Sequence, residues 1–420
     1  MSSMRIGFCS CIFWALAWPL LSGHIFSNAQ SILSATTMGI NYGQVADNLP
    51  SPELVVGLLR TNNISKIKLY SVNATVLKAF ANTGIEIIVG MGNEYVSTMA
   101  QANQAAEWIQ ENIQAYLPAT KITGIAVGNE VLTGSDAQLI ANLVPAMKNI
   151  HTALVKIGAA MDITITTPHS LAVLGNSFPP SAGYFRQDLT SVMKPLLDFL
   201  SQIGAPFFIN AYPYFAYKDE PNQVSLQYVL FEPNAGQVDP NNNAQYDNML
   251  YAQIDAVYSA LSALGYANLE VTVSETGWPS MGDTNEAGAT PQNAQAYNKN
   301  LMQLLAQNQG TPLRPRLDVK AYIFALFNED MKPGPNSERN YGLFKPDGTP
   351  TYNVGLVGSL HTSQSPISST STASSPTSSS DSTEYTFASS AKETRSVLSV
   401  IIYLHIMGLC SFLLGLPFRP

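Results

Sequence analysis

The feature that most constrains the fold of this 420-residue chain is an alternation of short apolar runs with amphipathic stretches, between about residues 35 and 358. Eight runs are rich in β-branched and aromatic residues, which favour strands. They cover residues 37–43, 66–71, 85–92, 122–130, 163–169, 206–215, 269–277 and 320–329. Apolar residues recur at three- and four-residue spacing between them, as in helices with one buried face. The clearest predicted helices cover residues 51–62, 97–117, 136–158 and 291–309.

Near-continuous apolar strands separated by helices predict a parallel sheet that is covered on both faces. Eight such units in one domain of this length predict an α/β fold, a single-domain (β/α)8 TIM barrel. The main alternative is an open, doubly wound sheet. It is disfavoured because no glycine-rich phosphate loop follows any of the predicted strands.

Several of the predicted strands end in polar or aromatic residues, although their interiors are apolar. The carboxyl ends of parallel barrel strands meet at one mouth, where barrels of this kind carry their chemistry. We therefore expect the functional side chains at that mouth. The residues at these strand ends are Asn41, Tyr42, Tyr70, Asn93, Glu94, Asn129, Glu130, Asn210, Tyr212, Tyr214, Glu275, Trp278, Asn328 and Glu329.

Two of these residues, Glu130 after "GIAVGN" and Glu275 after "VTVS", are carboxylates in tight motifs. A pair of carboxyl groups facing one cleft is the arrangement that hydrolyses glycosidic bonds. One carboxyl donates a proton to the leaving oxygen and the other attacks the anomeric carbon, so their environments must separate their pKa values. Either glutamate alone is more simply interpreted as a solvated strand-end residue. Two together, among aromatic residues that suit sugar rings, favour catalysis.

The stretch "LEVTVSETGWPSMG", residues 269–282, resembles the signature of glycoside hydrolase family 17, the plant-type endo-β-1,3-glucanases. Four other segments resemble further blocks of that family, in the same order. They are "GINYG" at 39–43, "AVGNEV" at 126–131, "INAYPYF" at 209–215 and "FNEDMKPGPNSERNYGLF" at 327–344. The resemblance covers about residues 37–357.

This resemblance implies a retaining double displacement, with Glu130 as general acid/base and Glu275 as the nucleophile. It implies that Asn129 faces the sugar 2-hydroxyl and that Lys332 helps to keep Glu275 ionised. For Lys332 and Glu338, a simple salt bridge within their loop is an equal alternative. The substrate-binding residues expected in total are Tyr42, Tyr70, Asn93, Asn129, Tyr212, Phe215, Trp278, Glu329, Lys332 and Glu338.

The composition limits the classes of partner and cofactor that the protein can bind. Charged residues make up only 12% of the chain and the net charge is −8, which argues against nucleic acid. The three cysteines, Cys9, Cys11 and Cys410, lie near the two ends, and the five histidines form no ligand-spaced cluster. We therefore expect no disulfide, metal or other cofactor. Some anchored relatives carry a cysteine-rich glucan-binding module, which the cysteine-free stretch 12–409 does not provide.

The N-terminal segment has the pattern of a secretory signal peptide. Arg5 precedes an apolar run, and small residues follow it. We expect a signal peptide over residues 1–29, with an N-terminal membrane anchor as the alternative. Two sequons, at Asn63 and Asn73, predict N-glycosylation and agree with secretion.

The C-terminal segment resembles a glycosylphosphatidylinositol (GPI) attachment signal. Residues 397–416 are apolar and uncharged, and small residues with a short polar spacer precede them. We expect a barrel over residues 30–358, a Ser/Thr/Pro-rich stalk over 359–390 and a removed propeptide over 391–420. The lipid is expected on Ser389. A true transmembrane helix is the alternative.

The sequence as a whole predicts a monomeric endo-hydrolase of cell-wall β-1,3-glucan of the callose type. We expect it on the extracellular face of the plasma membrane, held by a GPI anchor. Three alternatives stay open: a mixed-linkage β-1,3;1,4-glucanase, a glucan transglycosylase, and a non-catalytic glucan-binding surface protein. The intact Glu130/Glu275 pair argues against the last.

Overall fold

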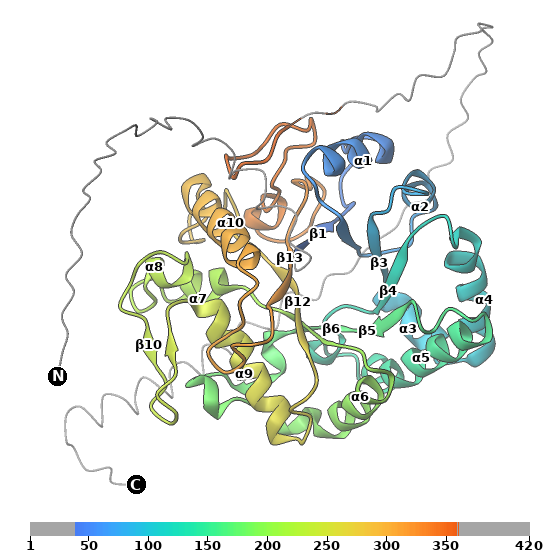
Figure 1. The fold of residues 1–420 in the computed structure, drawn as a ribbon, viewed down its shortest axis with the longest axis horizontal. Coiled ribbons are helices and arrows are strands. Elements are labelled where there is room, and N and C mark those ends of the chain that lie inside the picture. The colour runs from blue at the N-terminus through green and yellow to red at the C-terminus, as the bar shows by residue number, and fades with distance from the viewer. Residues whose placement is uncertain (1–37, 359, 361–420) are drawn as a thin grey trace, which may run out of the picture.

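Parallel strands form a ring at the centre of the molecule and helices surround it, as a computed structural model of residues 38–358 and 360 shows (Figure 1). The strand order is β5-β4-β3-β2-β1-β13-β12-β9-β6. Strands β5 and β6 are two parts of one stretch, separated by Thr167. The nine segments therefore amount to eight strand positions, and the predicted single-domain (β/α)8 barrel is confirmed. The strands of the ring are β1 (Met38–Tyr42), β2 (Lys66–Leu69), β3 (Glu86–Met91), β4 (Ile122–Val127), β5 (Thr164–Thr166), β6 (Pro168–Ser170), β9 (Phe207–Asn210), β12 (Val271–Thr276) and β13 (Lys320–Ile323).

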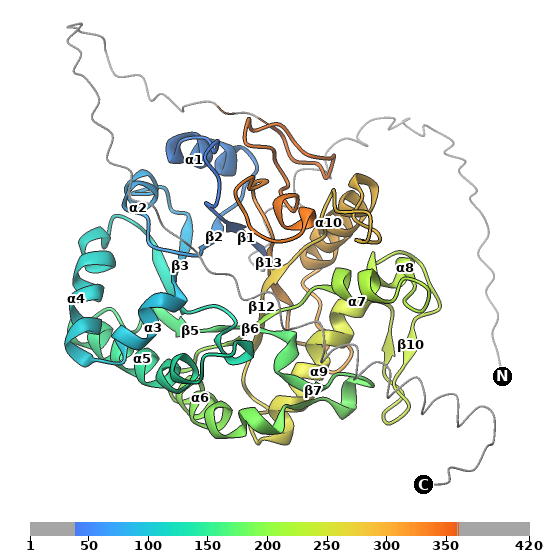
Figure 2. The ribbon, with the colours of Figure 1, turned by 180° about the vertical axis from the view of Figure 1, so that it is seen from behind.

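The helices follow the strands along the chain and cover the outside of the ring; Figure 2 shows the same arrangement from behind. The α-helices are α1 (Pro52–Thr61), α2 (Ala74–Ala79), α3 (Asn93–Met99), α4 (Ala102–Asn112), α5 (Ala137–Lys156), α6 (Thr190–Ile203), α7 (Pro213–Asp219), α8 (Leu226–Val229), α9 (Met249–Ala263) and α10 (Pro291–Ala306). Two small hairpins lie outside the ring: β7 (Leu174–Asn176) with β8 (Tyr184–Phe185), and β10 (Gln237–Val238) with β11 (Gln245–Tyr246). The short 3-10 helices are η2 (Gln114–Tyr116), η3 (Val131–Thr133), η4 (Leu171–Val173), η5 (Pro180–Ala182), η6 (Gln187–Leu189) and η7 (Asn336–Arg339).

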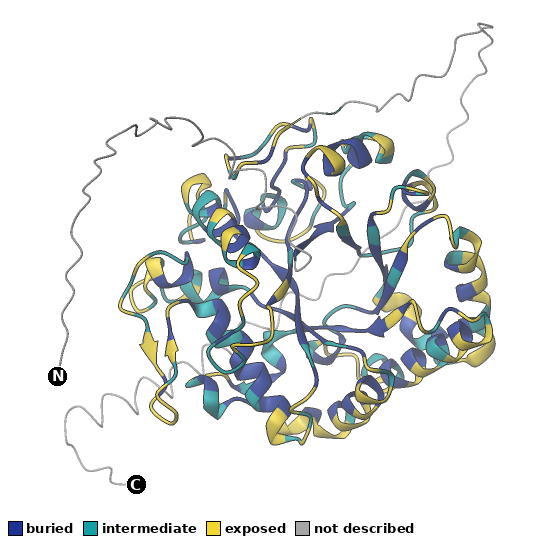
Figure 3. Cartoon of the chain, viewed as in Figure 1, coloured by how far each residue is buried: buried dark blue, intermediate teal, exposed yellow. Residues whose placement is uncertain are grey.

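The core has two parts, as expected for a barrel whose interior is filled with side chains. The larger part lies between the strands and the helices, so the helices are buried on one side and exposed on the other (Figure 3). The smaller part fills the barrel and consists of Ile88, Ala126 and Phe208 with Tyr322 packed against them. Gly39 belongs here too, because a Cβ at that position would lie 2.3 Å from the Tyr322 ring.

Several predicted elements differ from the observed ones. The predicted strand 320–329 is shorter and ends at Ile323. The predicted strand 206–215 ends at Asn210, because Pro213, whose fixed φ suits the first turn of a helix, starts α7. The predicted helix 97–117 is divided into α3 and α4 by the extended backbone of Gln101. The predicted strand 163–169 is divided at Thr167.

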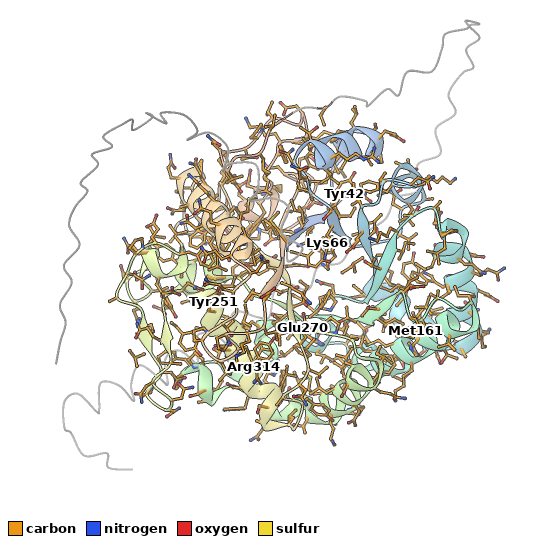
Figure 4. The ribbon with its side chains drawn as sticks, viewed as in Figure 1. Tyr42, Lys66, Met161, Tyr251, Glu270 and Arg314 are labelled. Atoms are coloured by element: carbon orange, nitrogen blue, oxygen red, sulfur yellow. The ribbon has the colours of Figure 1, made fainter. Side chains whose placement is uncertain are left out.

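The side chains on the outside of the barrel include few large apolar groups that are fully exposed. Met161, labelled in Figure 4, is 95% exposed on the turn before β5. None of the helices in the part of the chain that is described is both long and apolar enough to cross a membrane. The predicted signal peptide, most of the predicted stalk, including Ser389, and the predicted propeptide lie outside the described residues.

Candidate active site

Glu275 lies near the carboxyl end of β12, and both oxygens of its carboxylate are held by hydrogen-bond donors. The Lys68 ammonium donates to Oε1 at 2.9 Å and the Tyr212 hydroxyl donates to Oε2 at 2.9 Å. The residue is only 6% exposed. Two charge-assisted bonds from opposite sides fix the orientation of the carboxylate and stabilise negative charge on it.

Lys68 is 1% exposed and lies on β2, inside the barrel. Its ammonium also donates to Asn41 Oδ1 at 3.3 Å and lies 4.0 Å from the centre of the Tyr70 ring. Burial lowers the pKa of Lys68, and the neighbouring Glu275 charge opposes that shift. Lys68 was absent from the residues expected at the site. The sequence offers one signal for it. Lys68 is a charged residue between the apolar Ile67 and Leu69, and side chains alternate along a strand, so it points away from the helices and into the barrel.

Glu130 follows β4 in a left-handed backbone conformation, with φ 54° and ψ 28°. Gly128, two residues earlier, also has a positive φ of 66°. The Glu130 backbone N–H donates to the Pro168 carbonyl at 2.9 Å, and the Thr133 hydroxyl donates to the Glu130 carbonyl at 2.9 Å. A non-glycine residue with positive φ is unusual and concentrates at functional sites.

Asn210 donates a hydrogen bond to Glu130 and is the neighbour of Glu275 in the sheet. Its Nδ2 donates to Glu130 Oε1 at 2.9 Å, and its Oδ1 accepts from the Ser274 hydroxyl at 2.6 Å. In the register of β9 and β12, Asn210 is the partner of Glu275 itself. The sequence placed Asn210 at a strand end but did not assign it this bridging position.

The environment of Glu130 favours its protonated form. Burial and the negative charge of Glu275 raise the pKa of Glu130 to about 7, although the hydrogen bond from Asn210 and the Lys68 charge act in the opposite direction. A carboxyl group that is still about half protonated at neutral pH thus lies in the same mouth as a carboxylate paired with an ammonium. This is the division of roles that acid-assisted displacement requires.

An aromatic cluster supports Tyr212 beside Glu275. The Tyr212 ring lies 5.3 Å from Phe215, 5.9 Å from Tyr341 and 6.1 Å from Phe324. Burial, followed by the Glu275 charge, raises the pKa of Tyr212 well above its ordinary value, so its hydroxyl keeps the proton that it donates. The sequence predicted Tyr212 and Phe215 at the site; Phe324 and Tyr341 were missed.

Two aromatic residues that we expected to bind substrate are packed into the core. Trp278 has no exposed surface, donates from Nε1 to the Gly288 carbonyl at 2.8 Å and lies 5.1 Å from the Tyr214 ring. Direct contact between Trp278 and a sugar is therefore not supported. Tyr42 is 2% exposed and packs edge-on against Phe327 at 6.1 Å.

The charged residues after β13 contact one another and the loop after β1. Glu329 is buried, which raises its pKa, and its Oε1 accepts from the Val45 backbone N–H at 2.7 Å. Lys332 lies 3.4 Å from Glu338, so the salt bridge weighed as an alternative is present. The ammonium that contacts Glu275 is that of Lys68, whereas Lys332 pairs with Glu338.

Asn93 and Asn129 lie beside Glu130. The Asn93 side chain donates to the Asn129 carbonyl at 3.1 Å and accepts from the Asn129 backbone N–H at 2.7 Å. The Asn129 side-chain oxygen is buried and has no hydrogen-bond partner among the described residues, which leaves it available to a ligand. Within the same residues, no three His, Cys, Asp or Glu side chains are grouped so that they could hold a metal ion.

The two sequons differ in their surroundings. Asn63 is exposed in the turn after α1. Asn73 is half-buried at the start of α2, where its Oδ1 accepts from the Thr75 N–H at 3.0 Å and its Nδ2 donates to Gln44 at 3.1 Å. Glycosylation of either residue stays a prediction.

A (β/α)8 barrel with one protonated and one ion-paired carboxyl group at the carboxyl ends of β4 and β12 has the equipment of a glycoside hydrolase. Comparison with known proteins gives the particular family. The chain belongs to glycosyl hydrolases family 17, whose profile matches residues 38–356.

Named relatives and a solved structure both support this family. The chain is 54% identical over 326 residues to glucan endo-1,3-beta-glucosidase 11 of Arabidopsis thaliana, covering 77% of this chain and 76% of that protein. It is 51% identical over 337 residues to glucan endo-1,3-beta-glucosidase 14 of the same plant, covering 80% and 86%. The solved structure of CJP38, a β-1,3-glucanase and allergen of Cryptomeria japonica pollen, matches with a TM-score of 0.73 and 43% identity, over 76% of this chain and 99% of that one.

Proposed function

We propose that this protein is a retaining endo-hydrolase of β-1,3-glucosidic bonds in cell-wall glucan of the callose type. The observation that carries the proposal is the unequal pair at the mouth of the barrel: Glu130 beside the neutral Asn210, and Glu275 beside the Lys68 ammonium. The names of the similar plant proteins support the linkage.

In the first step the Glu275 carboxylate attacks the anomeric carbon while the Glu130 carboxyl protonates the departing glycosidic oxygen. A glycosyl–Glu275 ester forms, and the reducing-end fragment leaves with the proton of Glu130. The Lys68 and Tyr212 donors hold the carboxylate for the attack. In the second step Glu130, now ionised, removes a proton from water, and the resulting attack on the anomeric carbon releases Glu275. The anomeric configuration is retained because it inverts twice.

The distribution of products tests this function. We expect the purified protein to release oligosaccharides from laminarin, a β-1,3-glucan, and to act weakly on mixed-linkage β-1,3;1,4-glucan. The comparison matters because one structural match belongs to a study of two plant β-glucan endohydrolases with distinct substrate specificities. Efficient cleavage of the mixed-linkage polymer alone, or transfer products in place of hydrolysis products, would overturn the assignment.

We also propose that the mature protein begins near Gln30 and is held at the extracellular face of the plasma membrane by a lipid on Ser389. The N-terminal apolar run supports export. The Ser/Thr-rich stretch, the small residues around Ser389 and the apolar residues 397–416 support GPI attachment. The stalk would hold a monomeric barrel away from the membrane, within reach of wall polymer.

Phospholipase C specific for phosphatidylinositol tests the anchor. We expect it to release active enzyme from intact membranes. Mass spectrometry of the mature protein provides the decisive outcome: a recovered peptide that contains "IIYLHIMGLC" would show a retained apolar segment and contradict the anchor.

A further inference from the structure

We propose that Asn93 is a positioning residue for the acid Glu130, which it holds through the backbone of Asn129. The inference deepens the proposed function and rests on it, because it assumes that Glu130 supplies the proton. It also differs from the expectation drawn from the sequence, in which Asn93 binds substrate directly.

The contact between Asn93 and Asn129 is a two-bond pairing. The carboxamide oxygen accepts from the Asn129 N–H at 2.7 Å, and the carboxamide nitrogen donates to the Asn129 carbonyl at 3.1 Å. The two bonds also fix the orientation of the amide, because a rotated amide would place donor against donor and acceptor against acceptor. A single side chain thus satisfies both backbone polar groups of the residue that precedes Glu130.

This pairing acts on a backbone segment with unusual geometry. Gly128 and Glu130 both have positive φ values, 66° and 54°, on either side of Asn129. The left-handed conformation is costly for a residue with a side chain and persists where the surroundings enforce it. Here the surroundings are the Asn93 pairing on one side and the bond from the Glu130 N–H to the Pro168 carbonyl, at 2.9 Å, on the other.

Asn93 is itself exposed, but the helix that carries it is anchored in the core. It is the first residue of α3, and Val96 and Met99 of that helix are buried. A Cβ at Gly128 would lie 3.0 Å from Asn93 Oδ1, so the loop after β4 and the start of α3 are closely packed. Movement of the Glu130 turn therefore requires the loss of the Asn93 bonds.

The role predicts a selective defect. If Asn93 positions the acid, Asn93→Ala should slow bond cleavage where the leaving oxygen needs a proton, and much less where it does not. Loss of two hydrogen bonds of ordinary strength predicts a fall of about tenfold to a hundredfold in kcat/KM on a laminari-oligosaccharide. On a dinitrophenyl β-laminaribioside, whose leaving group departs without protonation, kcat/KM should fall by less than about threefold. The kcat/KM value is the appropriate measure because it reports only the steps up to formation of the glycosyl-enzyme.

Asn149→Ala is the matched control. The Asn149 amide donates to the Met99 carbonyl at 3.1 Å, at the other end of α3, and does not contact the Glu130 turn. We expect near-wild-type kcat/KM on both substrates. Asn93→Asp is a second variant, which keeps the acceptor for the Asn129 N–H and loses the donor. Thermal unfolding checks that each variant is folded.

Three outcomes decide the question. A selective loss in Asn93→Ala, absent from Asn149→Ala, supports the positioning role. An equal loss on both substrates overturns it and supports a substrate-binding role, since the two substrates share the sugar units on the non-reducing side. Glu130→Ala, measured in parallel, tests the proposed function separately. If its kcat/KM falls equally on the oligosaccharide and on the dinitrophenyl substrate, the assignment of Glu130 as the acid fails, whatever Asn93→Ala does.

Discussion

Removal of the Lys68 ammonium is the sharpest test of how the site holds the Glu275 carboxylate. In Lys68→Met, Glu275 loses the donor at 2.9 Å and stays buried beside Tyr212. Two unit charges at that distance attract by about 6 kcal/mol at an effective dielectric constant of about 20. Part of this attraction is offset by the cost of burying the lysine. Removing one partner of a buried pair typically costs about 3–5 kcal/mol.

The same loss should appear in the kinetics, because the Glu275 carboxylate without the Lys68 donor is no longer held in the orientation that attack requires. We expect kcat/KM on laminarin to fall by at least about a hundredfold. Lys68→Arg keeps the charge and should recover much of the activity.

Lys121→Met is the matched control, since it removes a surface ion pair, 3.0 Å from Glu86, and should change kcat/KM little. Circular dichroism and thermal unfolding establish that the variants fold. A folded Lys68→Met enzyme with wild-type kcat/KM would refute the reasoning.

Four further predictions concern the neighbouring residues. Glu275→Gly should abolish hydrolysis, and azide should restore turnover of a dinitrophenyl glycoside; normal activity in this variant would exclude Glu275 as the nucleophile. Because burial and Glu275 raise the pKa of Glu130 to about 7, and the protonated form is the active one, kcat/KM should decline as pH rises through about 7. Tyr212→Phe removes the donor to Oε2 and should lower kcat/KM about tenfold to a hundredfold, as expected for a hydrogen bond to a charged group. Glu130 binds its proton more tightly in the folded chain than in the unfolded one, so its contribution to stability is present below pH 4.5 and lost as pH rises through 7. The free energy of unfolding of Glu130→Gln should therefore exceed that of the wild type at pH 8, by at most about 3.4 kcal/mol, and differ little from it at pH 4.

The eight strand positions were predictable because each is a local pattern of apolar residues flanked by turn residues. The errors arose where one residue decides the local conformation. Pro213 ends the sixth strand position and starts α7, although "INAYPYF" reads as one apolar run. Gln101 adopts an extended backbone between two segments with the same helical periodicity, and nothing in that periodicity marks the break.

The two glutamates were predictable for a similar reason, since each lies in a short motif at a strand end. The side-chain contacts that the two glutamates make were not predictable. Lys68 and Glu275 are 207 positions apart in the chain, and Asn210 and Glu130 are 80 apart. Neither pair lies on adjacent strands, so the contacts depend on how the closed barrel brings non-adjacent strands together. Trp278 illustrates the opposite error. It lies three residues from Glu275, but helices α7 and α10 bring Tyr214 and Tyr297 against its ring and bury it.

The partners of the two carboxyl groups explain why identical side chains can take opposite roles. Glu275 contacts a cation, whereas Glu130 accepts a hydrogen bond from the neutral Asn210, so the cost of burying a negative charge is offset by an ion pair only at Glu275. The proximity of the pair reinforces the difference, because an ionised Glu275 further disfavours ionisation of Glu130. When Glu275 becomes an ester in the glycosyl-enzyme, its negative charge is removed. Glu130 should then release its proton more readily than before. The lost charge is the one that raised its pKa, and the Lys68 ammonium remains nearby. The residue that must act as an acid in the first step is thereby converted into the base of the second by the reaction itself.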